Sequence, residues 1–230
     1  MSPQNLPAVL REVRARIAQA AAAAGRSAQS VTLLAVGKAQ PAELLAAAAD
    51  CGVADFGESY LQEAPTKVAA LRGRELTWHF IGRIQANKTR AIAQTFAWVH
   101  ALDRLKVAER LAAQRPFHAP PLNVCLQVNV AGEASKGGVT PQELPALAAA
   151  VAQLPRLKLR GLMCIPPEER EPARQRSWFA RLRLLQAELN AGGHVLDTLS
   201  MGMSADFESA ILEGATIVRL GTVLFGARPP

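Results

Sequence analysis

The segment VTLLAVGKAQPAELLAAAADCG, residues 31–52, joins an apolar run to an alanine-rich run through a single lysine. VTLLAV (31–36) is typical of a buried strand, and the run that follows is typical of a helix with proline in its first turn and Gly52 at its end. Lys38 lies between the two. The segment therefore predicts a strand–helix unit that carries an amine at the carboxyl end of its strand.

The same unit recurs along the chain, because strand-like runs alternate with helical runs such as SWFARLRLLQAELNAGG (177–193). About eight such units in 230 residues predict a (β/α)8 barrel of the TIM type. An open, doubly wound sheet is the competing architecture, although no Gly-x-Gly-x-x-Gly follows the first strand-like run. The runs are 31–36, 54–59, 77–82, 96–102, 123–130, 157–165, 198–203 and 216–221.

The first 26 residues add an element before the first strand. Charged residues, among them Arg11, Glu12 and Arg14, interrupt the apolar residues at helical spacing, which predicts an extra N-terminal amphipathic helix. A transit peptide is a weaker interpretation, because Glu12 is acidic and the lead-in is short. No linker rich in proline, glycine or serine divides the chain, so residues 1–230 are expected to form a single domain.

The amino-acid composition and net charge limit the classes of partner expected for this chain. Hydrophobic residues make up 50% of the chain and charged residues 20%, as in globular proteins, and no apolar run approaches the roughly 20 residues that span a bilayer. The net charge is +7, but the arginines are dispersed and aromatic residues are only 5%, so neither nucleic acid nor membrane is an expected partner. Cys125 and Cys164 lie in strand-like runs, which predicts reduced core thiols and a cytoplasmic location.

Two glycine-containing segments follow the last two strand-like runs. SMGMSADF (200–207) places Gly202 and Ser204 before a helix expected to begin near Ala205, and RLGTVLFG (219–226) places Gly221 and Thr222 before a short helical segment. Glycine allows a ligand to approach the backbone, and N–H groups at a helix start bind anions. In TIM barrels these two loops commonly bind phosphate. The alternative is that both glycines only turn the chain.

The expected phosphate site suggests a chemical role for Lys38. An amine that faces bound phosphate across the barrel mouth can hold a phosphorylated aldehyde as a Schiff base, because a partly desolvated lysine near other cations is nucleophilic. Pyridoxal 5′-phosphate (PLP) carries both groups. Two alternatives stay open at this point: Lys38 is a solvated loop lysine, or the barrel processes sugar phosphates.

Several motifs together resemble the pyridoxal phosphate homeostasis proteins (the YggS/PROSC family). This resemblance implies a barrel similar to the PLP-binding domain of alanine racemase, with PLP covalently bound to Lys38. It also implies a protein of vitamin B6 homeostasis that stores PLP or delivers it to apo PLP enzymes; a monomer is expected. The motifs are LLAVGKAQP (33–41), FGESYLQE (56–63), WHFIGRIQANK (78–88), QVNVAGEASKGG (127–138), RGLMCIPP (160–167) and LSMGMSADFESAILEGATIVRLGTVLFGAR (199–228).

The resemblance also implies roles for individual residues. Arg219 would face the pyridine nitrogen. An arginine cannot act as an acid near neutral pH, so the ring would be a weak electron sink and the protein a non-catalytic carrier, with racemase-like proton exchange as the most it could catalyse. The alternative is a PLP-dependent amino acid racemase or decarboxylase, which normally has a second domain. The residues expected to cradle the phosphate are Ser200, Gly202, Met203, Ser204, Gly221 and Thr222.

Two positions depart from the family pattern, and two others have open roles. Gly37 stands where the family generally has serine, and Ser59 stands where it generally has asparagine. Lys136, in EASKGG (133–138), is either an exposed loop lysine or a second amine that binds PLP. His79 lies on an apolar strand, which favours a core histidine with satisfied hydrogen bonds over a catalytic base.

Overall fold

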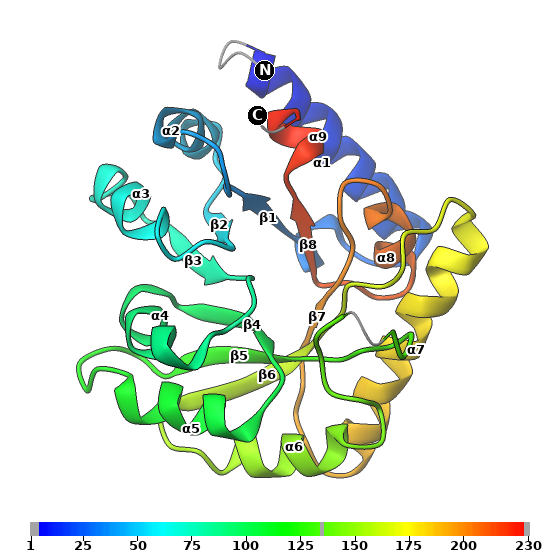
Figure 1. Cartoon of the computed structure of the whole chain (residues 1–230). Helices are drawn as coiled ribbons and strands as arrows, with labels where there is room; N and C mark the ends of the chain where they lie inside the picture. Colours follow the sequence, from blue (N-terminus) through cyan, green and yellow to red (C-terminus); the bar gives the residue numbers. More distant parts are fainter. Residues whose placement is uncertain (1–4, 134–135, 228–230) are drawn as a thin grey trace.

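The computed structural model describes residues 5–133 and 136–227, which form a closed barrel of eight parallel strands (Figure 1). Each strand pairs with the next in the chain, and β8 pairs with β1, where Leu33 lies opposite Val218. The predicted (β/α)8 barrel is confirmed, and the open sheet was the wrong alternative. The strands are β1 (Thr32–Val36), β2 (Asp55–Glu58), β3 (Thr77–Phe80), β4 (Trp98–Leu102), β5 (Leu122–Gln127), β6 (Leu157–Met163), β7 (Thr198–Ser200) and β8 (Ile217–Leu220).

Helices connect the strands and cover the outside of the barrel (Figure 1). Two of them begin at residues other than those expected. α7 begins at Pro172 rather than near Ser177, because proline is well suited to a first helical turn and the residues after it favour helix. α8 begins at Phe207 rather than near Ala205, because residues 204–206 form a turn. The helices are α1 (Leu6–Ala23), α2 (Ala42–Asp50), α3 (Ala64–Ala70), α4 (Thr89–Thr95), α5 (Leu105–Gln114), α6 (Leu144–Ala152), α7 (Pro172–Ala191), α8 (Phe207–Leu212) and α9 (Thr222–Phe225), with short 3-10 turns η2 (Ala28–Ser30) and η3 (Ala86–Lys88).

The extra N-terminal helix α1 is present and packs against α8 and α9, the helices that follow the last two strands (Figure 1). Its buried face includes Leu10 and Ile17. Its polar side is fixed to α8, because Arg16 pairs with Glu208 at 2.5 Å and its guanidinium lies 4.7 Å from the centre of the Phe207 ring. The helix therefore braces the two loops at which the sequence predicts a phosphate site.

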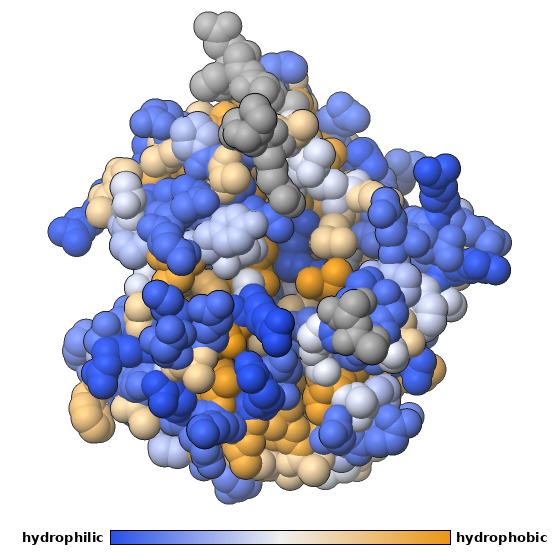
Figure 2. All heavy atoms as spheres, in the orientation of Figure 1, coloured by the Kyte–Doolittle hydropathy of each residue, from blue (hydrophilic) through white to orange (hydrophobic). Residues whose placement is uncertain are grey.

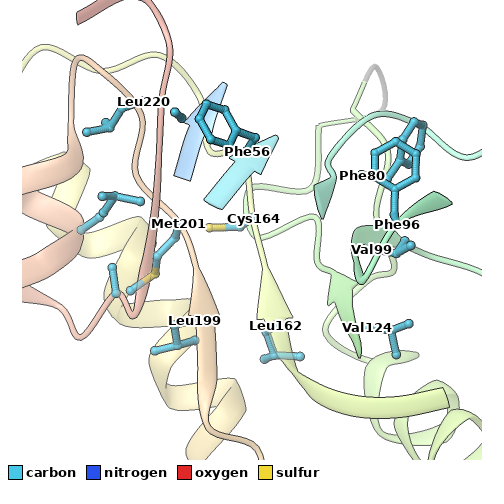
Figure 3. Packing of buried hydrophobic residues seen from close by; sticks show 14 of the residues in the cluster. Phe56, Phe80, Phe96, Val99, Val124, Leu162, Cys164, Leu199, Met201 and Leu220 are labelled. Carbon is cyan, nitrogen blue, oxygen red and sulfur yellow. The ribbon is translucent and has the colours of Figure 1, made fainter. Parts of the chain in front are cut away.

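The main core lies between the strands and the helices, where large apolar side chains pack together (Figure 3). Phe80 and Phe96, for example, have ring centres 5.2 Å apart. All three cysteines are free thiols. Burial raises the pKa of Cys125 and that of Cys164 to about 12, so both are neutral near pH 7 and pack as small apolar groups.

The inside of the barrel is more polar than is usual for this fold. TIM barrels generally fill this space with branched apolar side chains. Here His100 of β4 bonds to Ser200 of β7, and because those strands are not neighbours, their hydrogen bond crosses the barrel interior. His79 and Arg219 are buried beside them. The interior therefore holds a polar network in place of a purely apolar plug.

Two structural features are absent from residues 5–133 and 136–227. No helix there is both long enough and apolar enough to cross a membrane. The same residues contain no group of three or more histidine, cysteine, aspartate or glutamate side chains arranged to hold a metal ion.

Gly161 should be essential for the pairing of β6 with β7. A Cβ atom at this position would lie 1.8 Å from the carbonyl oxygen of Thr198, and a backbone atom cannot move aside as a side chain can. We expect Gly161→Ala to lower the free energy of unfolding by about 3 kcal/mol, at the upper end of overpacking costs, in urea denaturation. Gly137→Ala is the matched control, because its new Cβ would meet only side-chain atoms at 3.7 Å or more. Equal urea midpoints for the two variants would contradict the requirement for glycine at position 161.

Candidate functional site

The carboxyl ends of the strands surround a cavity of about 270 Å³ at one end of the barrel, which we call the mouth. The surface is hollowed near the centre of the barrel, where hydrophilic and hydrophobic residues meet (Figure 2). Six of the eight residues predicted to bind the cofactor line this cavity: Lys38, Met203, Ser204, Arg219, Gly221 and Thr222. The structure thus brings together residues from the first, seventh and eighth strand–helix units.

The other two predicted residues, Ser200 and Gly202, lie behind the cavity wall. The Ser200 hydroxyl is buried and accepts a hydrogen bond from Arg219, with Nη1 and Oγ 2.9 Å apart. The carbonyl of Gly202 accepts a hydrogen bond from the backbone N–H of Arg219. Both residues therefore contact the arginine, and the cavity wall is formed by their neighbours.

Lys38 and the loop after β8 are neighbours, whereas the sequence analysis places them across the mouth from each other. β1 pairs with β8, so the ends of these two strands lie side by side. Lys38, Gly221 and Thr222 line a small hollow of about 30 Å³ that adjoins the larger cavity. The closure of the barrel accounts for the difference, because the first strand of a closed barrel is adjacent to the last.

Lys38 stands on a tight turn at the end of β1. The N–H of Gln40 bonds to the carbonyl of Gly37 at 3.0 Å, which places Lys38 and Ala39 in the two central positions. Ala39 has a φ of 57°, a left-handed conformation that costs a residue with a side chain about 1 kcal/mol. Such a conformation persists only where the surroundings enforce it. Here the carboxylate of Glu63 does so by accepting the N–H of Ala39 at 3.0 Å.

A buried ammonium group, that of Lys67, is hydrogen-bonded to this turn. Nζ of Lys67, from α3, donates to the Gly37 carbonyl at 2.7 Å, to Glu58 Oε1 at 2.9 Å and to Glu63 Oε2 at 2.7 Å. All three of its donors are therefore used, and each bond leads to the Lys38 turn or to the end of β2. Lys67 is not predicted from the sequence as a site residue. Its only signal there is the Glu63–Lys67 spacing, which resembles an ordinary ion pair on a helix surface.

Glu58 is the least well solvated carboxylate of this cluster. Its side chain is fully buried, and within the described residues no hydrogen-bond partner reaches its second oxygen, Oε2. Burial raises the pKa of Glu58, although the hydrogen bond and the charge of Lys67 oppose the rise. Glu63 is more exposed, and there the hydrogen bonds from Lys67 and Ala39 outweigh burial and lower its pKa.

The absence of a side chain at position 37 has a local cause. A Cβ atom on Gly37 would lie 2.7 Å from Glu58 Oε1 and 2.7 Å from a methyl carbon of Leu45. Glycine therefore leaves room for the carboxylate that pairs with Lys67. The other departure, Ser59, lines the cavity, so the exchange of asparagine for serine falls at the site itself.

Gly202 and Gly221 differ in their reasons for being glycine. Gly202 has a φ of 92° and would place a Cβ 2.6 Å from the Cβ of Ala210, so the turn and its packing against α8 require glycine. Gly221 has no such requirement, since its Cβ would make only ordinary contacts with Val36. Its backbone lines both cavities, directly before α9. The hydroxyl of Ser204 joins the two loops by accepting the N–H of Val223.

Arg219 is buried and held mainly by carbonyl groups. Nη1 donates to the Ser200 carbonyl at 2.6 Å, and Nη2 donates to the Cys164 carbonyl at 2.8 Å. No ion pair within 4.0 Å of a carboxylate is found for it among the described residues. Burial lowers the pKa of Arg219, although the charge of Asp206 acts to raise it, and a guanidinium remains charged at neutral pH. The mouth thus contains a fixed cation that can only donate hydrogen bonds.

The remaining candidates also have defined places. Lys136 is partly buried, and its Nζ donates to the Pro166 carbonyl at 2.8 Å and pairs with Glu133 at 3.0 Å. Its role as a second PLP amine stays a prediction. His79 is a buried histidine with both ring nitrogens in hydrogen-bonding contacts, as the sequence analysis favours.

Lys67→Met should destabilise the fold by about 3 kcal/mol at about pH 8, because it leaves the carboxylate of Glu58 buried without its partner. The loss should shrink at about pH 5. A carboxyl whose pKa is raised on folding binds its proton more tightly in the folded state, so lower pH favours the folded protein. Urea denaturation at both pH values measures this. Arg74→Met, which removes an exposed ion pair with Asp50, should leave the midpoint nearly unchanged. A loss in Lys67→Met that is the same at both pH values would contradict the assigned charge on Glu58.

The matches to known proteins cover nearly all of the chain. The family model of the alanine racemase N-terminal domain matches residues 10–229. The pyridoxal phosphate homeostasis protein of Pseudomonas aeruginosa is 62% identical over 217 residues, covering 94% of this chain and 93% of that protein. The protein with the same name from Escherichia coli (strain K12) is 49% identical over 222 residues, covering 95% of each chain.

A solved structure agrees with these matches. PipY of Synechococcus elongatus PCC7942, with PLP bound, is similar with a TM-score of 0.80 at 37% identity, covering 91% of this chain and 100% of that one. The resemblance drawn from the sequence motifs is thereby confirmed. The chain belongs to the pyridoxal phosphate homeostasis protein family and is built on the barrel of the alanine racemase N-terminal domain.

Proposed function

We propose that this protein binds PLP as a Schiff base on Lys38 and holds it for storage or delivery in vitamin B6 homeostasis. In this proposal residues 1–230 act as one PLP-binding domain in the cytoplasm, with apo PLP enzymes as recipients. The observation that carries it is that Lys38 lines the same hollow as Gly221 and Thr222. The PLP bound to PipY, which is 37% identical, supports it.

The residues at the mouth fit the chemistry of PLP. Lys38 offers an amine for the aldehyde. Ser204, Gly221 and Thr222 offer hydroxyl groups and backbone close to the start of α9 for the phosphate. Arg219 borders the same cavity and offers N–H donors to the pyridine nitrogen. The aldehyde is therefore matched by an amine, the phosphate by hydroxyl and backbone groups, and the ring nitrogen by hydrogen-bond donors.

Lys38 acts in this proposal as a reversible nucleophile. Its neutral Nζ adds to the aldehyde carbon, the aldehyde oxygen leaves as water, and a carbon–nitrogen double bond remains; nothing is oxidised or reduced. A second amine can displace Lys38 by the same addition and elimination. The strained turn fixes the backbone from which the Lys38 side chain extends, because Glu63 and Lys67 hold the residues on either side of it.

Arg219 supports a carrier, or at most racemase-like proton exchange, over a PLP enzyme that stabilises a carbanion strongly, such as a decarboxylase. When bound, PLP supplies an electron sink for carbanions, and that sink is strongest when an acid protonates its ring nitrogen. A guanidinium donates a hydrogen bond but keeps its proton at neutral pH. The ring nitrogen beside Arg219 therefore stays unprotonated, which disfavours carbanion chemistry.

The attachment site can be located directly. The native protein with PLP should show a visible absorbance band, and borohydride reduction followed by peptide mapping should find the adduct on Lys38. Lys38→Ala should lose both signals, because the nucleophile is gone. Lys136→Ala is the matched control and should keep the band. An adduct found on another lysine alone, or on none, would overturn the proposal, whereas an adduct on both lysines would support Lys136 as a second amine.

Delivery can be tested by transfer of PLP to an apo enzyme. We expect the loaded protein to restore the apo enzyme's activity faster than PLP dissociates into solution, because Lys38 is only half buried and lines a cavity at the surface. The release rate without acceptor, measured with a PLP-trapping amine, is the control. Equal rates with and without the apo enzyme would show that the protein stores PLP without delivering it.

A further inference from the structure

A single file of hydrogen-bonded side chains runs through the barrel from Asp55 to Arg219. Asp55 Oδ1 lies 3.0 Å from His79 Nε2, and His79 Nδ1 lies 2.9 Å from His100 Nε2. His100 Nδ1 lies 2.7 Å from Ser200 Oγ, which accepts from Arg219 Nη1 at 2.9 Å. Strands β2, β3, β4, β7 and β8 each contribute one residue. We call these five residues the polar chain.

The polar chain links opposite ends of the barrel. Asp55 is the first residue of β2, and its side chain is 28% exposed beside a hollow lined by the starts of β1 and β2. Arg219 borders the cavity at the mouth. The histidines and Ser200 between them are at most 1% exposed. Solvent therefore meets the polar chain at the Asp55 end and at the mouth, but not between them.

The end residues determine where each proton lies. An aspartate carboxylate only accepts hydrogen bonds, so His79 must carry its proton on Nε2. If His79 is neutral, its Nδ1 is an acceptor, and His100 must donate to it from Nε2. If His100 is also neutral, its Nδ1 accepts the hydroxyl proton of Ser200. That leaves Ser200 Oγ as the acceptor for Arg219, which can only donate.

Burial supports both neutral rings. It lowers the pKa of His79 despite the opposing effect of Asp55. It lowers the pKa of His100 further, and the charges of His79 and Arg219 act in the same direction. The ring of His79 is also held in place, since it stacks on Trp98 with ring centres 5.5 Å apart and an interplanar angle of 9°. Every donor in the polar chain then points from the cation toward the anion, which is the favourable direction for the bond dipoles.

We propose that His79 and His100 are positioning residues that fix Arg219 for contact with the pyridine nitrogen of PLP. The inference rests on the proposed function. Through the polar chain, Ser200 Oγ becomes a pure acceptor toward Nη1, while the Ser200 and Cys164 carbonyls hold the rest of the guanidinium edge. These contacts fix the orientation of the guanidinium group. The directions of its remaining N–H groups are therefore fixed as well.

The proton positions can be read without PLP. In the protein labelled with ¹⁵N-histidine, long-range ¹H–¹⁵N correlation spectra should show His79 and His100 as neutral rings protonated on Nε2 from about pH 6 to 8. His118 is exposed and serves as a reference in the same spectrum. A proton on Nδ1 of either buried ring, or a doubly protonated ring, would overturn the assigned direction of the polar chain.

Asp55→Asn tests the link to PLP from outside the cavity. An asparagine amide can donate to His79 Nε2, so the variant can reverse the polar chain and populate rings protonated on Nδ1. We expect this second population, an altered absorbance maximum of bound PLP, and an increase in the PLP dissociation constant of about tenfold. Asp197→Asn is the control, because Asp197 pairs with Arg160 at the same end of the barrel and lies outside the polar chain.

The outcomes separate the two proposals. Changed histidine protons with an unchanged PLP spectrum and affinity would overturn the positioning role while leaving the proposed function intact. Unchanged histidine protons in Asp55→Asn together with weakened PLP binding would also overturn it, because the effect would then not pass through the polar chain. If the native protein fails to form the Lys38 adduct, the proposed function itself fails, and the positioning role fails with it.

Discussion

The ammonium group of Lys67 is the contact on which the mouth of this barrel depends. It joins the backbone at the end of β1 to two carboxylates, one at the end of β2 and one just before α3. One of those carboxylates, from Glu63, holds the left-handed backbone of Ala39. The backbone that carries Lys38 is therefore held by a buried charge cluster, and the cluster joins α3 to the ends of the first two strands.

The fold could be predicted from the sequence because its signals are local and repeated. Each strand-like run predicted one strand of the barrel, and the glycine-containing loops after the seventh and eighth runs did meet at the mouth. Lys67 could not be predicted in this way. Four residues after Glu63, it has the spacing of a solvated helix pair, and only the packing of α3 in three dimensions removes it from water. The adjacency of Lys38 and Gly221 likewise depends on how the barrel closes.

The polar chain shows the same limit more clearly. The sequence indicated a satisfied histidine at position 79, but its partners Asp55 and His100 come from neighbouring strands 24 and 21 residues away. Gly202 and Gly221 look alike in the sequence, yet only Gly202 is required by its backbone and its packing. A barrel interior built from such a network buries less apolar surface than one filled with aliphatic side chains. Its side chains have fixed positions, because each buried polar group must keep its hydrogen-bond partner.

The buried thiols bear on the selectivity of this mouth for amines. Cys164 lies directly after β6, and its backbone carbonyl contacts Arg219, but its side chain is buried in the main core and is not among the residues that line the cavity at the mouth. A Cys164 thiolate that reached the cavity would compete for an aldehyde and form a hemithioacetal. With the pKa of Cys164 at about 12, roughly one molecule in 10⁵ carries that thiolate at pH 7. Burial thus keeps this sulfur both neutral and out of the cavity, which Lys38 lines.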